Sequence, residues 1–318
     1  MSEDLPLVSI VIPCRSVDSM TRECVSKCLE LDYDNFEIIV LPDSTDSDPL
    51  DGARVVPTGP ASPGLKRNIG SQIASGEVLA YTDSDAYPRR DWLRRSVSLL
   101  RQQAVGAVGG PGLTPPEDSS FAQAQGAILA SSMVSGGISS RYRSATAIDS
   151  DDIHSVNLVA WRRAIEGSGG WNEQYWPGED TLLCLSLKKS GYRMLLAPDI
   201  VVYHHRRSSW SAYFNQIRSY GIHRGFFAKR FPENSMRPAY FLPSLMLVGL
   251  VIGLFISALF PLFRLLMIAV VAAYFVLLLV VAASDSSNFL RIVGGIPVTH
   301  FAYGIGFMEG LATRSLRK

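Results

Sequence analysis

Short apolar runs alternate with polar, amphipathic stretches over the first 230 residues. Runs rich in β-branched residues and bounded by turn residues are typical of strands. Strands are predicted over residues 8–13, 36–41, 53–56, 77–82, 105–108, 156–161, 192–196 and 200–204. Helices are predicted between them, over residues 18–31, 62–76, 91–103, 163–166 and 180–190, with a further helix and a flexible loop within 119–150. This alternation predicts an α/β fold whose sheet is largely parallel, with helices on both faces.

Charge disappears from the C-terminal third of the chain. Residues 238–263 carry no charge, Arg264 interrupts, and residues 265–284 are again uncharged. Each stretch is long enough to cross about 30 Å of hydrocarbon as a helix. We therefore predict a soluble domain over 1–235 and a membrane region over 236–318. Transmembrane helices are expected at about 239–261 and 265–284, with a buried soluble hairpin or a re-entrant hairpin as alternatives.

A third hydrophobic segment, at about 290–310, is interrupted by glycines, Pro297 and His300. It is either a third span or a helix in the membrane interface. The end of the chain is basic, with Arg314, Arg317 and Lys318, and positive charge favours the cytoplasmic side. We expect two spans plus an interfacial segment, which makes a multi-pass membrane protein with its N-terminal domain in the cytoplasm.

Composition narrows the class of protein. The net charge is +1, so nothing indicates a nucleic-acid partner. The four cysteines form neither a metal-binding pattern nor a disulfide framework, and reduced thiols suit a cytosolic catalytic domain. Nothing in the sequence indicates an oligomeric state.

Two acidic pairs are the candidate chemistry. Asp83 and Asp85 end a predicted strand, and the period of two places both side chains on one side. Open α/β sheets bind ligands at the carboxyl ends of their strands, and hard divalent cations prefer oxygen ligands. Glu179 and Asp180 form a separate pair that could supply a base, although acids in a first helical turn are also favoured by the helix dipole. The two pairs together indicate metal-assisted transfer from a phosphorylated donor.

Seven motifs in this order resemble glycosyltransferase family 2. They are Val8–Pro13, Glu37–Val40, Arg67–Gly70, Asp83–Asp85, Gly169–Glu173, Gly178–Asp180 and Val202–His204. The resemblance covers about residues 5–230. It implies the GT-A fold, which is Rossmann-like, and inversion at the anomeric carbon of a sugar taken from a nucleotide-sugar donor. A hydrophobic tail is common among members that glycosylate lipid-linked acceptors.

The resemblance also implies roles for the acids. Asp85 would bind a divalent metal, Mg²⁺ or Mn²⁺, and Asp83 would contact the ribose or join the metal shell. His204 would complete that shell, since imidazole suits Mn²⁺. The metal would neutralise the charge of the departing nucleoside diphosphate. Asp180 would be the general base for an acceptor hydroxyl, with Glu179 orienting it or binding the acceptor.

The nucleotide is expected beside the ends of the first two strands. Pro13 and Arg15 follow the first strand, where the family holds the nucleotide, although Arg15 is equally consistent with a solvated loop residue. Asp43 matches the second of two family acids and would contact the base. Pro42 stands in place of the first acid, and the family's following glycine is absent. This departure concerns base specificity more than catalysis.

Four more side chains are candidates for substrate contact. Arg67 matches the family and is expected to bind the donor, whereas Lys66 is equally consistent with a structural role. Trp176 would stack on a sugar or pack structurally. Arg218, in the basic and aromatic segment 206–224, would bind a phosphate of donor or acceptor, or belong to a juxtamembrane patch.

We therefore expect a metal-dependent inverting glycosyltransferase of the cell envelope that glycosylates a hydroxyl of a lipid-linked or glycan acceptor. One alternative is a polyprenyl-phosphate glycosyltransferase, whose acceptor is already ionised and needs no base. The presence of Glu179 and Asp180 favours the hydroxyl acceptor. A second alternative is a non-catalytic membrane protein that binds nucleotide sugars.

Overall fold

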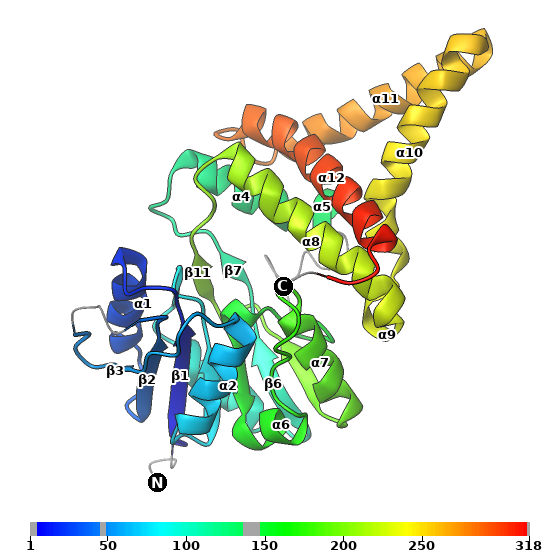
Figure 1. Cartoon of the computed structure of the whole chain (residues 1–318). Helices are drawn as coiled ribbons and strands as arrows, with labels where there is room; N and C mark the ends of the chain where they lie inside the picture. Colours follow the sequence, from blue (N-terminus) through cyan, green and yellow to red (C-terminus); the bar gives the residue numbers. More distant parts are fainter. Residues whose placement is uncertain (1–4, 45–48, 136–146, 317–318) are drawn as a thin grey trace. The chain divides into compact units, whose positions relative to one another are not determined.

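The computed structural model describes residues 5–44, 49–135 and 147–316. The chain groups into two compact units. The sheet unit comprises Met1–Pro115 and Ser140–His205, and the helical unit comprises Pro116–Ser139 and Arg206–Arg317 (Figure 1). The predicted boundary at residue 235 remains a prediction. The predicted loop around Gly136, Gly137 and Arg141–Arg143, and the basic residues Arg317 and Lys318, lie outside the described residues.

The main sheet of the sheet unit has, within the described residues, eight strands in the order β3-β2-β1-β4-β9-β6-β10-β8. The strands are β1 (Val8–Pro13), β2 (Phe36–Leu41), β3 (Arg54–Val55), β4 (Val78–Tyr81), β6 (Val105–Gly109), β8 (Ile148–Asp149), β9 (Leu158–Trp161) and β10 (Arg193–Leu196). The neighbours β3, β2, β1 and β4 are parallel, as are β6 and β10. Strand β9 runs antiparallel to both β4 and β6. The predicted α/β class and largely parallel sheet are confirmed, with two unpredicted reversals, β9 and the edge strand β8, which is antiparallel to β10.

Helices cover both faces of this sheet. They are α1 (Ser19–Leu29), α2 (Pro63–Ile73), α3 (Trp92–Leu100), α6 (Arg162–Gly167) and α7 (Glu179–Lys189), with a 3₁₀ turn at Ser155–Asn157. Strand β1 shows the consequence, because Ile10 and Ile12 join the core on one face while Val11 joins the core on the other. A strand buried on both sides is apolar throughout. This burial explains why the strand signals were continuous apolar runs.

Helix α2 ends at Ile73, three residues before the predicted stop at Gly76. The glycine serves strand packing instead. Its backbone N–H donates to Ser9 Oγ at 2.8 Å, and a Cβ at this position would lie 2.6 Å from the carbonyl oxygen of Leu7. Only glycine allows the chain to approach β1 this closely.

A second, smaller sheet has the order β5-β11-β7, with β5 at Ala86–Pro88, β11 at Val202–His204 and β7 at Gly112–Leu113. Strands β5 and β7 were not predicted, because two or three residues carry too little periodicity to be recognised. Strand β11 pairs antiparallel with β5, and this register sets His204 opposite Ala86. A histidine at the end of β11 is thereby brought beside the acidic turn before β5.

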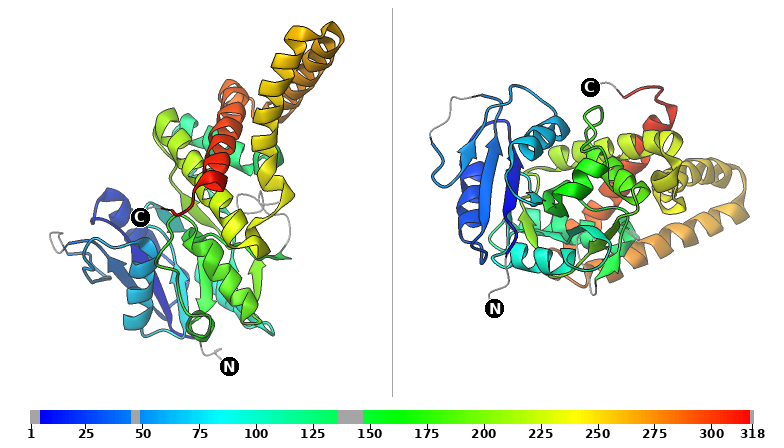
Figure 2. Two further views of the ribbon diagram at one scale, coloured as in Figure 1. Left: turned by 45° about the vertical axis from the view of Figure 1, so that its right-hand side comes forward. Right: turned by 90° about the horizontal axis from the view of Figure 1, so that it is seen from below.

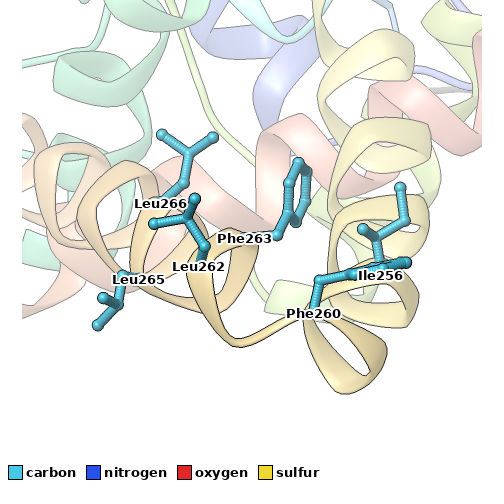
Figure 3. Close-up of a pocket in the computed structure, with 6 residues that line it drawn as sticks. All are labelled: Ile256, Phe260, Leu262, Phe263, Leu265 and Leu266. Atoms are coloured by element: carbon cyan, nitrogen blue, oxygen red, sulfur yellow. The ribbon is translucent and has the colours of Figure 1, made fainter.

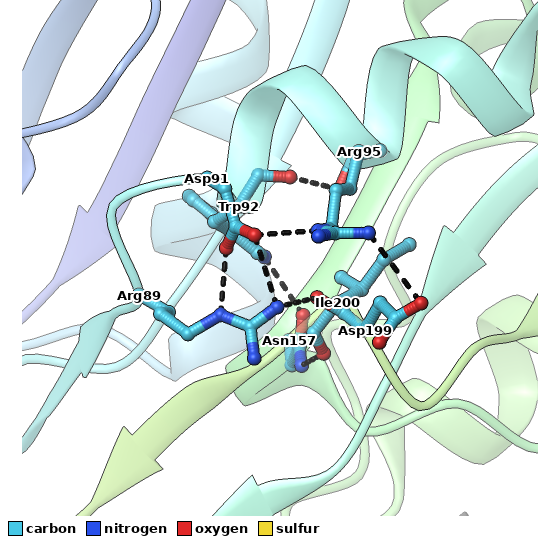
Figure 4. A network of polar contacts seen from close by, with 8 residues as sticks. Arg89, Asp91, Trp92, Arg95, Asn157, Asp199 and Ile200 are labelled. Carbon is cyan, nitrogen blue, oxygen red and sulfur yellow. Dashed lines mark hydrogen bonds and ion pairs between the residues drawn. The ribbon is translucent and has the colours of Figure 1, made fainter. Parts of the chain in front are cut away.

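Polar contacts fix the chain that leads into β11 (Figure 4). Arg89 donates to Asp91 at 2.6 Å and to the backbone carbonyl of Asp199 at 2.7 Å. The buried Asn157 accepts from the Trp92 indole at 2.9 Å and donates to the carbonyl of Ile200 at 2.8 Å. These bonds hold the segment before β11 against the start of α3. The position of His204 is therefore set by packing several residues away.

The helical unit contains α4 (Ser120–Ala130), α5 (Ser132–Ser135), α8 (Trp210–Arg230), α9 (Pro232–Ser235), α10 (Pro238–Leu259), α11 (Pro261–Ala282) and α12 (Phe289–Ala312). Helices α8 and α12 lie side by side and touch through glycines (Figures 1 and 2). A Cβ at Gly225 would lie 2.1 Å from the Phe307 carbonyl oxygen, and a Cβ at Gly310 would lie 2.0 Å from the Ile222 carbonyl oxygen. Small residues let two helix backbones approach closely.

Helices α10 and α11 are long and apolar enough to cross a membrane. Each helix has 22 residues, and the mean hydropathy of its most apolar part is 2.4 in α10 and 3.1 in α11. Of that part, 22% is buried within the protein in α10 and 11% in α11. At 1.5 Å per residue each is about 33 Å long, which matches a hydrocarbon core. Within the described residues no other helix meets these criteria, so the third predicted segment, now α12, is not among the candidate spans.

An apolar hollow of about 570 Å³ lies where α10 and α11 join (Figure 3). Its lining residues are all hydrophobic: Ile256, Phe260, Leu262, Phe263, Leu265 and Leu266. Such a surface offers no hydrogen bond to a charged ligand. It therefore belongs to the apolar exterior of this helix pair rather than to a polar binding site.

Candidate functional site

Asp83, Asp85 and His204 form one cluster. Each offers a ligand atom, and these atoms all lie within 4.8 Å of one another. His204 Nε2 is 3.3 Å from a carboxylate oxygen of Asp85, and the three side chains are partly buried. This grouping matches the prediction from the sequence, but the predicted reason for it is partly wrong. Strand β4 ends at Tyr81, so the two acids meet in the turn before β5 rather than by strand alternation.

The cluster has the composition of a divalent-metal site. Two ligands of one Mg²⁺ or Mn²⁺ ion, each at about 2.1 Å, are separated by at most about 4.2 Å. Side-chain movements of less than an ångström would bring the three atoms into that range. Carboxylate oxygens suit both ions and an imidazole nitrogen suits Mn²⁺. Among the described residues this is the one group of three or more metal-binding side chains found.

The second acidic pair opens helix α7. Gly178 caps the helix with a positive φ of 114°, and Glu179 and Asp180 occupy its first turn. Asp180 is partly exposed and accepts a bond from the backbone N–H of Thr181 at 2.7 Å. Glu179 is 4% exposed. The accessible carboxylate is therefore Asp180, and its neighbour is part of the protein interior.

The guanidinium of Arg67 bridges the two acidic pairs. One terminal nitrogen donates to Asp83 at 2.6 Å and the other to Glu179 at 2.8 Å. The guanidinium also lies over the ring of Trp171, 4.7 Å from its centre. Burial raises the pKa of Glu179 to about 7, with Arg67 opposing this shift and the charge of Asp180 adding to it.

Asn68, the next residue of α2, holds the loop that leads to α7. Its amide oxygen accepts from the backbone N–H of Trp171 at 2.8 Å, and its amide nitrogen donates to the Trp171 carbonyl at 2.9 Å. The same nitrogen donates to Glu173 at 2.8 Å. Gly170 has a φ of 75°, and a Cβ there would lie 2.8 Å from the Asn68 amide oxygen. Trp176 follows in this loop and is 55% exposed, which suits contact with a substrate.

The ends of β1 and β2 meet beside α2. Pro13 is the buried last residue of β1, and Arg15 is exposed two residues later. The backbone N–H of Asp43 donates to the carbonyl of Arg15 at 3.0 Å, so the predicted base-contacting acid lies next to this loop.

Lys66 of α2 has a structural role, which its sequence context does not distinguish from donor binding. Its ammonium group donates to the carbonyls of Cys14 at 2.6 Å and Leu41 at 3.0 Å, and it forms a short ion pair with Asp43. The Lys66 side chain is 4% exposed, whereas that of Asp43 is 31% exposed. One signal in the sequence was the spacing of four residues between Lys66 and Gly70, which places both on the same face of the helix. Lys66 thus holds Asp43 in place at the carboxyl edge of the sheet.

Arg218, the predicted phosphate-binding residue, lies in α8. Its guanidinium pairs with Glu309 of α12 at 2.7 Å, and both side chains are about two-fifths exposed. The pair ties the two helices together, and the predicted role of Arg218 in binding phosphate remains a prediction.

Comparison with known proteins places the chain in a family. The model of the family described as "Glycosyl transferase family group 2" matches residues 78–283, about two thirds of the chain. The pre-mycofactocin glycosyltransferase of Mycobacterium tuberculosis is 26% identical over 240 residues, which are 72% of this chain and 49% of that protein. The chain thus spans about half the length of that relative.

Two further proteins are similar over more of their own length. A Methanococcus voltae enzyme is 21% identical over 277 residues, covering 79% of this chain and 85% of that protein. It is a dolichyl N-acetyl-α-D-glucosaminyl phosphate 3-β-D-2,3-diacetamido-2,3-dideoxy-β-D-glucuronosyltransferase. The mannosyltransferase PcManGT from Pyrobaculum calidifontis, solved with GDP-Man and Mn²⁺, shares the fold with a TM-score of 0.65 and 20% identity, over 96% of this chain and 88% of that chain. Because the family model matches well over half of the chain, this chain belongs to glycosyl transferase family group 2.

Proposed function

We propose that the protein is a metal-dependent, inverting glycosyltransferase that moves a sugar from a nucleotide-sugar donor to a hydroxyl group of a lipid-linked acceptor at a membrane. One observation carries the proposal. A cluster of two carboxylates and an imidazole lies at one place, and a separate, accessible carboxylate opens α7. A displacement with inversion needs this division, since one group of side chains serves the leaving diphosphate and a single base serves the acceptor.

The donor side rests on Asp83, Asp85 and His204, which would hold the divalent ion. When bound, the ion supplies positive charge to the diphosphate as it leaves. Lys66 keeps Asp43 at the ends of β1 and β2, where a nucleotide base would lie. A protein of the same fold holds a nucleotide sugar together with Mn²⁺, which supports this arrangement through fold alone.

The acceptor side rests on Asp180. This carboxylate takes the proton of the acceptor hydroxyl while the oxygen forms its bond to the anomeric carbon. The bond from that carbon to the donor phosphate breaks on the opposite face, and the nucleoside diphosphate leaves with the electron pair. No covalent intermediate with the enzyme forms. Trp176, exposed in the loop before α7, offers an apolar face for a sugar ring.

A lipid-linked acceptor is supported by the helical unit. Helices α10 and α11 expose large apolar side chains along their lengths and have the size of membrane spans. The relative from Methanococcus voltae acts on a sugar carried by a dolichyl phosphate. Basic residues near the end of the chain, such as Arg314, would place that end and the sheet unit in the cytoplasm.

The test begins with binding. Full-length protein in detergent is screened for thermal stabilisation by UDP-, GDP- and dTDP-sugars, each with Mn²⁺, with Mg²⁺ and with a chelator. Selective stabilisation by one donor, lost with the chelator, is expected. No stabilisation by any donor across the panel would reject the donor assignment.

Transfer is then measured with that donor and a polyprenyl-linked sugar. Asp85→Ala and Asp180→Asn are each expected to lower kcat by at least 100-fold, whereas Asp34→Asn, at an exposed acid, is the control that leaves it unchanged. Full activity of the Asp180→Asn protein would reject the base assignment and favour a phosphate acceptor. Donor binding without turnover across all acceptors would instead favour the non-catalytic alternative.

A further inference from the structure

We propose that Arg67 is a positioning residue that holds the metal-binding acid Asp83 and the base-bearing helix α7 in one arrangement. The inference rests on the metal site and the base of the proposed function. It gives Arg67 a role that acts through other residues, whereas the family resemblance implied contact with the donor.

Arg67 is shielded from solvent and from substrate. The Arg67 side chain is 2% exposed, and its two terminal nitrogens are each engaged by an acid of the protein. The face of the guanidinium lies over the ring of Trp171, which is itself buried. A donor molecule would therefore meet Asp83 before it met Arg67. Any effect of the arginine on the donor passes through that carboxylate.

The Arg67 guanidinium bridges two acids that are far apart in the chain. Asp83 lies 16 residues along the chain from Arg67 and Glu179 lies 112 residues away, yet one planar group reaches both. A guanidinium presents its donors in a rigid fork, so the distance between two bonded acids is set by the fork. Asp83 has a second carboxylate oxygen that can serve a metal ion. Glu179 immediately precedes Asp180, so the same fork fixes the start of α7.

The surroundings of Arg67 hold its side chain in place. A carboxylate as buried as Glu179 requires a hydrogen-bonded partner, and Arg67 is the residue that donates to it. Asn68 hydrogen-bonds to both the backbone N–H and the carbonyl of Trp171, the residue whose ring packs against the Arg67 guanidinium. These contacts fix the position of the arginine side chain, so it does not move when a substrate binds. A fixed cation between the two acidic pairs is what preorganised positioning requires.

The experiment measures Mn²⁺ affinity directly, from the signal of free Mn²⁺ in electron paramagnetic resonance, with full-length protein in detergent. Partners of metal ligands typically change affinity 10- to 100-fold. Arg67→Met is therefore expected to weaken Mn²⁺ binding by at least 10-fold. Arg162→Met is the matched control, because that arginine also makes partly buried bonds to α2 and its flank but touches neither Asp83 nor Glu179. It should leave Mn²⁺ affinity unchanged.

A double-mutant cycle then tests the link to α7. Glu179→Met keeps the bond from Arg67 to Asp83 and removes the other, so Mn²⁺ affinity should change less than threefold while kcat for transfer falls about 10-fold. In the Arg67→Met background the same substitution should lower kcat no further, because the link is already broken. Independent, additive losses in kcat would overturn the proposal.

The outcomes separate this inference from the proposed function. Wild-type protein that binds no Mn²⁺ would reject the metal site itself. If the wild type and a folded Arg67→Met variant bind Mn²⁺ with equal affinity, only the role of Arg67 is rejected. Should Arg67→Met fail to fold, Arg67→Lys decides. It keeps the charge but cannot span both acids, so Mn²⁺ binding at least threefold weaker is expected, and wild-type affinity would overturn the proposal.

Discussion

Replacing Lys66 by methionine removes a buried cation while keeping a similar volume. The ammonium group donates to the carbonyls of Cys14 and Leu41, at the ends of β1 and β2, and pairs with Asp43. Methionine fills the space but donates nothing. The two carbonyl oxygens then lose the charged donor that lies between the strands, and the Asp43 carboxylate loses the partner that fixes its direction.

The size of the loss follows from these contacts. Each hydrogen bond from a charged group stabilises the folded state by about 1.5–3 kcal/mol. The ion pair with Asp43 adds little, because that carboxylate is 31% exposed and screened by water. Burial of the lysine ammonium group also carries a desolvation cost, which methionine avoids. The net loss is therefore about 2–4 kcal/mol. In a chain of this size that corresponds to a Tm lower by about 4–12 °C.

The assay is thermal unfolding of the full-length protein in detergent, followed by tryptophan fluorescence at one scan rate. The control is Lys27→Met. Lys27 also pairs with an acid, Glu30 at 3.0 Å, but on the surface of α1 with 41% of its side chain exposed. Such pairs contribute about 0.2–0.5 kcal/mol, so this variant should change the Tm by no more than about 2 °C. The Lys66→Met protein should also bind its nucleotide-sugar donor more weakly, because Asp43 is no longer held.

A single outcome would refute this reasoning. If Lys66→Met and Lys27→Met lower the Tm by the same small amount, the buried ammonium group does not hold the strand ends together. A lower Tm with unchanged donor affinity would keep the structural role of Lys66. It would remove the argument that Lys66 orients Asp43 toward the nucleotide.

Three further predictions concern other parts of the fold. Asn68→Ala removes three hydrogen bonds to the loop before α7 and should cost about 1–3 kcal/mol, measured as a lower Tm, with more rapid proteolysis within that loop. Glu179 has its pKa raised to about 7 from 4.5, so the folded state binds more protons between those values and stability falls as the pH rises through them. The free energy of unfolding falls by about 3 kcal/mol at most across this range. Glu179→Gln should therefore show a smaller difference in Tm between pH 5 and pH 8 than the wild type, and a difference equal to that of the wild type would contradict the assignment. Gly225→Ala should lower the Tm, because its methyl group would lie 2.1 Å from a carbonyl oxygen of α12, whereas Gly294→Ala in α12 has free space and should raise it; the same sign for both would contradict the packing argument.

Much of the sheet unit was readable from the sequence because its elements are locally encoded. The runs at 8–13 and 36–41 coincide with β1 and β2, since strands buried on both faces are apolar throughout. The two hydrophobic stretches became α10 and α11, because about 20 uncharged residues in a row predict a long apolar helix in any context. The acidic pairs were identified by their positions at element ends.

Elements defined only by their partners were missed. Strands β5, β7 and β8 have two or three residues each, and they exist because neighbouring strands offer hydrogen bonds. The reversed direction of β9 has no local signal, since the period of a strand is the same in both directions. Helix α8 was not predicted either, because the segment has no clear apolar stripe and is stabilised by contact with α12.

The sequence by itself identified the acids of the site that we propose, Asp83, Asp85 and Asp180, because their types and places at element ends are local facts. The tertiary structure decided what surrounds them. Lys66 and Arg67 are adjacent in α2, and successive helical residues point about 100° apart. Packing of α2 over the sheet therefore sends the lysine to the ends of β1 and β2 and the arginine to the two acidic pairs. No local pattern contains that division, because it depends on strands and helices that meet only in the folded chain.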